Sequence, residues 1–213
     1  MDIQFWSDAV CPWCYIGKRR LERALAQWPG EVTVTYRAYQ LDASPVPQPL
    51  PLKKAMAEVF GDPQRTAEML AHVTAVAAAE GLTLDFDRAL AANTLAAHRL
   101  IAWAATQGRQ ADLLDALQRA HFTDGLDIGS FPTLARIAGA IGLDAAAALA
   151  YLRSDAGTAA VVTDLTAAHE LAITTVPFLL IDGKYAVQGA QETAALLDAF
   201  AEITRREAVD AGL

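Results

Sequence analysis

The feature that most limits what this chain can fold into is its pair of cysteines. Both stand in the segment Cys11-Pro12-Trp13-Cys14, directly after the strand-like run of residues 2–6. Pro12 suits the first turn of a helix, where its missing N–H costs little. The first thiol would then lie at a helix N-terminus, where free N–H groups and the helix dipole stabilise a thiolate. Because a thiolate is the attacking species in disulfide exchange, this arrangement is typical of a redox dithiol.

Two other uses of such a pair are open. It could be half of a zinc site, or two inert buried side chains. Zinc needs about four ligands, and His72, His98, His121 and His169 are scattered without ligand spacing. The sequence therefore favours redox or thiol-binding chemistry, and we expect neither a metal nor a bound cofactor.

Composition restricts the partners of the chain. The 213 residues are enough for one large domain or for a domain with an insertion. A hydrophobic content of 54% supplies a core without a disulfide. The formal charge of −8 opposes nucleic-acid binding, which relies on basic side chains.

The sequence also predicts a location. Residues 1–5 lack the basic and apolar regions of a signal peptide. Charges interrupt each alanine-rich stretch well before the roughly 20 residues that a membrane span needs. We therefore expect a cytoplasmic protein that binds no membrane, and in the reducing cytosol a dithiol is more plausibly catalytic or sensory than structural.

The order of predicted elements gives an α/β fold with a large insertion. A strand, a helix over 14–28 and a strand over 32–39 form a right-handed β-α-β unit. Four alternating prolines between 45 and 51 then indicate an extended linker. Little β signal follows as far as residue 150. Helical patterns occur instead, over 52–60, 63–80, 87–107, 110–123, 130–141 and 144–152.

The C-terminal part reads α-β-β-α. A helix over 155–171 precedes strands at 178–181 and 184–188, and a last helix covers 192–206. Asp182-Gly183 between the strands favours a primed hairpin turn. We therefore expect one domain from residues 1–44 and 154–213, interrupted by an all-helical domain over 45–153.

Several motifs together resemble a known family. The Cys-Pro-x-Cys, the helical insertion and Thr175-Val176-Pro177-Phe178 resemble the thioredoxin-fold DsbA superfamily. Residues 7–17, Asn93-Thr94 with His98, and Gly189-Ala190-Gln191 are similar to its cytoplasmic FrnE-like branch of thiol-disulfide oxidoreductases and disulfide isomerases. The resemblance covers essentially the whole chain and implies a thioredoxin-like fold.

The resemblance also implies roles for individual residues. Cys11 would be the nucleophile and Cys14 the resolving thiol. Val176-Pro177 would be a cis-proline loop facing the dithiol, although a trans proline is also common where a strand begins. The Val176 backbone would pair with an extended substrate. The implied substrate-binding residues are Pro12, Trp13, Val176, Pro177, His98, Gly189 and Gln191.

Trp13 departs from the periplasmic oxidases of this superfamily, which have a histidine at that position. Histidine can carry a positive charge beside the thiolate and indole cannot. We therefore do not expect a strongly oxidising thiol. Lys18, Arg19 and Arg20 could add positive potential, but their usual place is a solvated helix face.

The remaining candidates each have a structural alternative. Asp8 could accept a proton, yet an aspartate there more often caps a turn or helix. His98 shares a helical face with Thr94, yet a lone histidine on an apolar helix is more often structural. Asn93 suits an N-cap. Trp6, Trp13 and Tyr15 favour packing over a substrate platform, and the helix start at 189–192 could receive a carboxylate.

The leading hypothesis is a thiol-disulfide oxidoreductase or isomerase that acts on protein or low-molecular-weight disulfides and thiols through a mixed disulfide. The alternative is a glutathione-dependent isomerase or transferase of the 2-hydroxychromene-2-carboxylate isomerase or kappa type, with glutathione as co-substrate. Serine is typical at the nucleophile position there, so Cys11 and Cys14 argue against it. A redox sensor is a third class. A homodimer through the helical block is open, without a sustained heptad pattern to support it.

Overall fold

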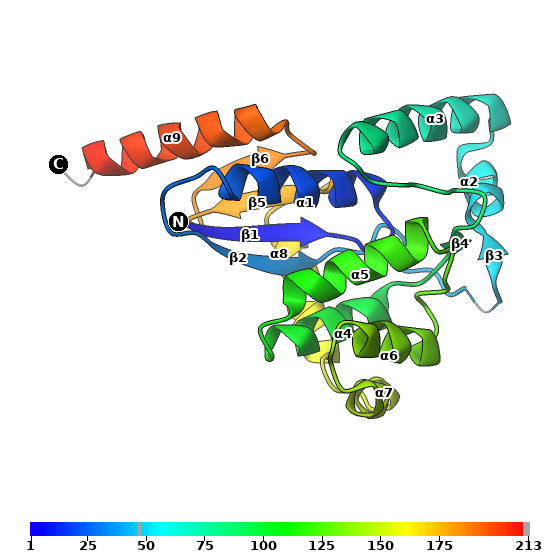
Figure 1. The fold of residues 1–213 in the computed structure, drawn as a ribbon. Coiled ribbons are helices and arrows are strands. Elements are labelled where there is room, and N and C mark those ends of the chain that lie inside the picture. The colour runs from blue at the N-terminus through cyan, green and yellow to red at the C-terminus, as the bar shows by residue number, and fades with distance from the viewer. Residues whose placement is uncertain (47, 211–213) are drawn as a thin grey trace.

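A mixed four-stranded sheet lies at the centre of the molecule. The computed structural model describes residues 1–46 and 48–210. The strands are β1 (Asp2–Ser7), β2 (Thr33–Ala38), β5 (Phe178–Ile181) and β6 (Tyr185–Gln188), in the order β2-β1-β5-β6. β1 runs parallel to β2 and antiparallel to β5. The two predicted halves therefore meet in one thioredoxin-like sheet, as expected (Figure 1).

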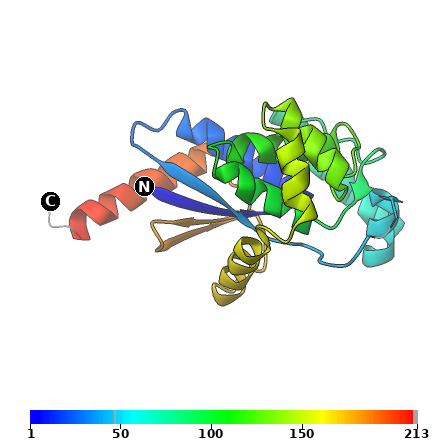
Figure 2. The same ribbon diagram turned by 90° about the horizontal axis from the view of Figure 1, so that it is seen from below.

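Helices cover both faces of this sheet. α1 (Pro12–Leu25) and α9 (Thr193–Asp210) lie on one face, and α8 (Thr158–Glu170) lies on the other (Figures 1 and 2). Successive residues of a strand point to opposite faces. Phe5 accordingly packs in the cluster that contains Leu21 and Phe200, whereas Trp6 packs with Ala168 beneath the sheet. The strand β1 is thus buried on both sides.

The insertion is mainly helical and flanks the start of α1. Its helices are α2 (Leu52–Phe60), α3 (Pro63–Ala79), α4 (Leu95–Ala105), α5 (Gln110–Phe122), α6 (Phe131–Ala140) and α7 (Ala145–Arg153). α3 lies along one side of α1 and α5 along the other (Figure 1). Each described helix is too short or too polar to span a bilayer.

The prediction of a helix from residue 87 is wrong at its beginning. The Asp85 carboxylate accepts from the N–H groups of Asp87 and Arg88, which forms a turn. β4 (Leu90–Ala91) then pairs with β3 (Leu50–Pro51) in a second, two-stranded sheet. Pairing with a distant segment has overridden local helix propensity. The extended proline linker, which was excluded only as a central strand, supplies the partner in a two-stranded sheet.

Two local predictions, one about the hairpin turn and one about the loop before β5, are confirmed. Asp182 and Gly183 have φ angles of 51° and 66°. Two successive positive φ angles are what a primed two-residue turn requires. The Val176–Pro177 peptide bond is cis. The loop before β5 and the hairpin after it are therefore arranged as the sequence indicated.

Candidate active site

Cys11 and Cys14 lie at the N-terminal end of α1, where β1 delivers the chain. Cys11 occupies the N-cap position with extended backbone angles, and no side chain caps the helix. Its carbonyl accepts from the N–H groups of Cys14 and Tyr15 at 3.1 and 3.2 Å. Cys11 is 4% exposed and Cys14 is 0% exposed. Both cysteines are free, and of the two only Cys11 retains any exposed surface.

The loop with the cis proline faces the first thiol. The Sγ atom of Cys11 lies 3.9 Å from the carbonyl oxygen of Val176 and donates to it. The N–H of Gly189 donates to the Pro177 carbonyl at 2.8 Å, which ties the start of the last loop to this one. A Cβ atom at Gly17 would lie 2.8 Å from Cγ of Pro177. Only glycine at that position lets α1 pack so closely on the loop.

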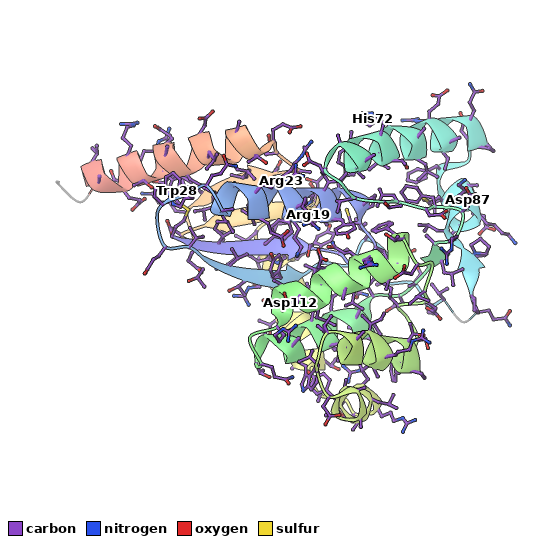
Figure 3. The ribbon with its side chains drawn as sticks, viewed as in Figure 1. Arg19, Arg23, Trp28, His72, Asp87 and Asp112 are labelled. Carbon is purple, nitrogen blue, oxygen red and sulfur yellow. The ribbon has the colours of Figure 1, made fainter. Side chains whose placement is uncertain are left out.

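The other predicted substrate-binding residues differ in how far they are exposed. Pro12, Trp13 and Gly189 are half-buried and Gln191 is exposed. The Trp13 ring lies 5.9 Å from that of His72, so the insertion contacts the residue next to Cys14. Figure 3 shows His72 on α3. Tyr15 and Trp6 are buried in the cores, which confirms packing as their role. His98 is 3% exposed and contacts Asp8 and Tyr39, so it is not part of the surface around Cys11.

Electrostatics distinguish the two thiols. Burial raises the pKa of Cys14 well above its ordinary value, and the hydrogen bond with Cys11 and the charge of Cys11 raise it further. The backbone of Asp8 lowers it by hydrogen bonding, while the Asp8 charge raises it. Burial therefore holds Cys14 as a neutral thiol.

A buried carboxylate lies in the loop between β1 and α1, at Asp8. Asp8 is 0% exposed; its Oδ2 atom accepts from the Leu41 N–H at 2.8 Å, and its Oδ1 atom lies 3.3 Å from Nε2 of His98. The same Nε2 lies 2.9 Å from the Tyr39 carbonyl, which can only accept, so this nitrogen carries a proton. The expectation that Asp8 caps a turn or helix is wrong: it joins the loop after β2 to α4.

Sequence reasoning missed two polar residues of α5. His121 and Gln118 are both 0% exposed. Burial lowers the pKa of His121 to about 4, and the charge of Asp8 opposes this shift. Both residues follow Leu114 and Leu117 on the apolar face of the helix. This spacing could have predicted that both residues are buried, because side chains on the apolar face of a helix point into the core.

The cations of α1 also differ from expectation. Lys18 is 2% exposed and pairs with Glu22 and Asp115, and Arg20 is 7% exposed. A fully solvated face was therefore the wrong prediction. The guanidinium of Arg20 pairs with Glu80 of the insertion at 2.6 Å. It also contacts two groups that follow β6, the Ala190 carbonyl at 2.7 Å and Glu192 at 2.6 Å.

The N-cap of α4 is Thr94 and not Asn93, although Oδ1 of Asn93 accepts from the Leu95 N–H one residue further on. Among residues 1–46 and 48–210, no group of three or more histidine, cysteine, aspartate or glutamate side chains could hold a metal ion.

The fold and the dithiol facing a cis proline define a thioredoxin-fold protein of the DsbA type. The chain belongs to the DSBA-like thioredoxin family, whose domain model matches residues 2–201. It is similar to the crystal structure of a probable DsbA oxidoreductase from Streptomyces coelicolor, with 33% identity, a TM-score of 0.89 and coverage of 95% of this chain and 89% of that one.

Two more distant structures share the fold. The cytosolic disulfide reductase DsbM from Pseudomonas aeruginosa is 20% identical, with a TM-score of 0.66 and coverage of 97% and 99%. A 2-hydroxychromene-2-carboxylate isomerase is 19% identical, with a TM-score of 0.73 and coverage of 98% of both chains. No curated protein matched the sequence.

Proposed function

We propose that this protein is a cytoplasmic thiol-disulfide oxidoreductase or disulfide isomerase of the FrnE-like branch, with Cys11 as nucleophile and Cys14 as resolving thiol. One observation carries the proposal. Cys11 has access to solvent at a helix N-terminus opposite the Val176 carbonyl, while Cys14 is fully buried with a raised pKa. Membership of a family of thiol-disulfide oxidoreductases supports it.

The proposed reaction has two exchange steps. The Cys11 thiolate attacks one sulfur of a substrate disulfide, the substrate S–S bond breaks, and the second substrate sulfur leaves as a thiolate. Cys14 then attacks Cys11 Sγ, which forms the Cys11–Cys14 disulfide and releases the first substrate sulfur. The dithiol has lost two electrons and the substrate has gained them. The same two steps in reverse oxidise a substrate dithiol. If another thiol of the substrate attacks the mixed disulfide before Cys14 does, Cys11 is released and the substrate disulfide is isomerised.

The surface around Cys11 suits an extended thiol or disulfide substrate. The Val176 backbone would bind the main chain beside the reacting sulfur, with Trp13 and the segment from Gly189 to Gln191 as further contacts. Glutathione is a co-substrate in this proposal, supported by the structure of the related DsbM reductase with GSH. In the same proposal residues 45–153 form a separate helical domain that supplies the rim through His72.

Two assays test this function. Reduction of insulin and isomerisation of scrambled ribonuclease should be followed with the wild type, Cys11→Ser and Cys14→Ser. We expect Cys11→Ser to lose both activities because no mixed disulfide can form at the accessible position. Cys14→Ser should lose insulin reduction, because Cys14 can no longer resolve the mixed disulfide, and should retain part of the isomerisation activity. Full activity without Cys11 would refute the proposal.

A glutathione-dependent isomerase or transferase is the second candidate, favoured by the shared fold with the chromene-carboxylate isomerase over 98% of both chains. In that case Cys11 would assist a bound glutathione thiol instead of exchanging with it. Titration of reduced glutathione into Cys11→Ser, with chromene-carboxylate turnover measured in parallel, separates the two. Tight binding with turnover would favour the isomerase, and neither is expected here.

A further inference from the structure

Arg20 connects three separate parts of the chain through one guanidinium group. It lies on α1, and its side chain is 8% exposed. The Nε atom donates to Oε1 of Glu80, the C-cap residue of α3, at 2.6 Å. The Nη1 atom donates to the Ala190 carbonyl at 2.7 Å, and Nη2 pairs with Oε1 of Glu192 at 2.6 Å. The side chain therefore joins α1 and the insertion to residues 189–192, the loop between β6 and α9 (Figure 1).

The burial of this ionic cluster is poorly explained by stability alone. A buried charge is costly unless it is paired, and Glu80 is also 8% exposed, with its Oε2 atom accepting from Arg23. Replacing a buried ion pair with apolar residues is often neutral or stabilising. A planar guanidinium, however, fixes the direction of each partner, which a lysine ammonium does not. The contacts of Arg20 therefore suit a role in placing the 189–192 loop.

The 189–192 loop is packed against the loop with the cis proline. The N–H of Gly189 donates to the Pro177 carbonyl at 2.8 Å. A Cβ atom at Gly17 of α1 would lie 2.8 Å from Cγ of Pro177 and 3.5 Å from Cα and Cβ of Ala190. Arg20 follows Gly17 by three residues and so lies on the same face of α1. Arg20 thus holds Ala190 against the face of the helix that Pro177 also contacts.

The cis-proline loop in turn faces the reacting thiol. The Val176 carbonyl accepts from Cys11 Sγ at 3.9 Å. In the proposed function, the Val176 backbone pairs with the main chain of an extended substrate beside the reacting sulfur. A small disulfide without peptide groups cannot form that pairing. A shift of the loop should therefore slow the reaction of a peptide disulfide more than that of a small disulfide.

We propose that Arg20 is a positioning residue that favours extended peptide disulfides over small ones. It holds the 189–192 loop on α1, this loop fixes Pro177, and the Val176 backbone is thereby kept where a peptide main chain can pair with it. Glu80 orients the guanidinium, so the insertion takes part in substrate selection through α3. Arg20 itself transfers neither electrons nor protons, and the exchange steps are those of the proposed function.

This inference rests on the proposed function, and its test compares two substrates with the same leaving group. One is a short linear peptide whose cysteine is joined by a disulfide to 2-mercaptoethanol. The other is 2-hydroxyethyl disulfide, which has no peptide groups. Each is added in excess to reduced Cys14→Ser protein, in which the adduct on Cys11 is not resolved, and samples are quenched with acid and analysed by intact mass. The measured quantity is the rate constant for the peptide adduct divided by that for the 2-mercaptoethanol adduct.

Arg20→Lys, Arg20→Met and Arg23→Met are compared in the same background, and the unfolding midpoint of each is measured in urea. Arg23→Met is the matched control, because both side-chain hydrogen bonds of Arg23 go to Glu80. We expect the ratio to fall about tenfold in both Arg20 variants, since a displacement of about 1 Å can cost up to about 100-fold and a smaller shift is expected here. Arg23→Met should lower the midpoint and leave the ratio unchanged.

The contrary outcomes are distinct. An unchanged ratio in the Arg20 variants, whatever their midpoints, would show that the ion pair is purely structural and would overturn the proposal. If Arg20→Met does not fold, Arg20→Lys decides alone. An equal fall of the ratio in Arg23→Met would show that any damage around Glu80 has this effect, and would also overturn the role of Arg20. Absence of an adduct on Cys11 with both disulfides, before any further substitution, would overturn the proposed function itself.

Discussion

Replacing Gly17 by alanine should strain the contact between α1 and the cis-proline loop. The new Cβ atom would lie 2.8 Å from Cγ of Pro177 and 3.5 Å from Cα and Cβ of Ala190. The first distance is about 0.7 Å shorter than the roughly 3.5 Å at which carbon atoms meet without repulsion. The proline ring is packed and rigid, so α1 or the loop must move.

The magnitude follows from two opposing terms. Overpacking of this kind costs about 1–3 kcal/mol. Alanine in place of glycine within a helix returns about 1 kcal/mol. We therefore expect a net loss of about 1 kcal/mol, or about 2–4 °C in the unfolding midpoint for a chain of this size. Urea denaturation followed by tryptophan fluorescence measures it.

Activity should fall more than stability. The Val176 carbonyl lies 3.9 Å from Cys11 Sγ, so a shifted loop changes the reacting geometry. A displacement of about 1 Å can cost up to about 100-fold in rate, and a smaller shift here should cost about tenfold in kcat/KM for disulfide reduction. Gly139→Ala in α6 is the comparison variant: its Cβ would lie 3.0 Å from Cβ of Ala145, a close contact that involves neither the dithiol nor the cis-proline loop, so it should affect stability without the loss of activity. Wild-type stability and activity in Gly17→Ala would refute the packing argument.

Three further predictions concern buried charge and backbone geometry. Glu80→Gln should cost about 3 kcal/mol in urea unfolding, because Arg20, 8% exposed at its side chain, loses its buried partner; a change under about 1 kcal/mol would contradict this. The pKa of His121 is lowered to about 4 from 6.5, so the unfolded chain binds the proton more readily than the folded chain does. As the pH is lowered from about 6.5 to 4, the free energy of unfolding should therefore fall by up to about 1.4 kcal/mol per pH unit. His121→Phe should remove that part of the slope, and an unchanged slope would show that other groups cause it. Gly183→Ala should lose about 1 kcal/mol in the same unfolding assay because φ is 66° there, whereas equal stability would mean that the turn relaxes.

The sequence predicted the parts of the fold that depend on local chemistry. Asp182-Gly183 demanded a primed turn, and the β-α-β and α-β-β-α halves joined in one sheet because their strands carry clear apolar patterns. The first turn of α1 was predictable because Pro12 and the preceding strand both fix it. These signals lie within a few residues of the elements that they specify.

The parts that failed depend on distant partners. Leu90–Ala91 became a strand only because Leu50–Pro51 pairs with it, and nothing within residues 87–94 records that pairing. Arg20 is buried because Glu80 lies opposite it, although the two are far apart in sequence.

The candidate site divides in the same way. Cys11, Cys14 and the cis bond at Pro177 were predicted from motifs and confirmed as neighbours. The apolar face of α5 could have predicted that His121 is buried, but its surroundings depend on how α5 packs against the rest of the chain, which no local pattern records.

The most direct test of the central claim is trapping of the mixed disulfide. Reduced Cys14→Ser should be incubated with a substrate disulfide and its intact mass measured without added reductant, followed by peptide mapping. The account predicts one stable adduct per chain, located on Cys11, whereas wild type should pass through the adduct to the Cys11–Cys14 disulfide. An adduct on neither thiol, or turnover in Cys11→Ser equal to that of wild type, would contradict it.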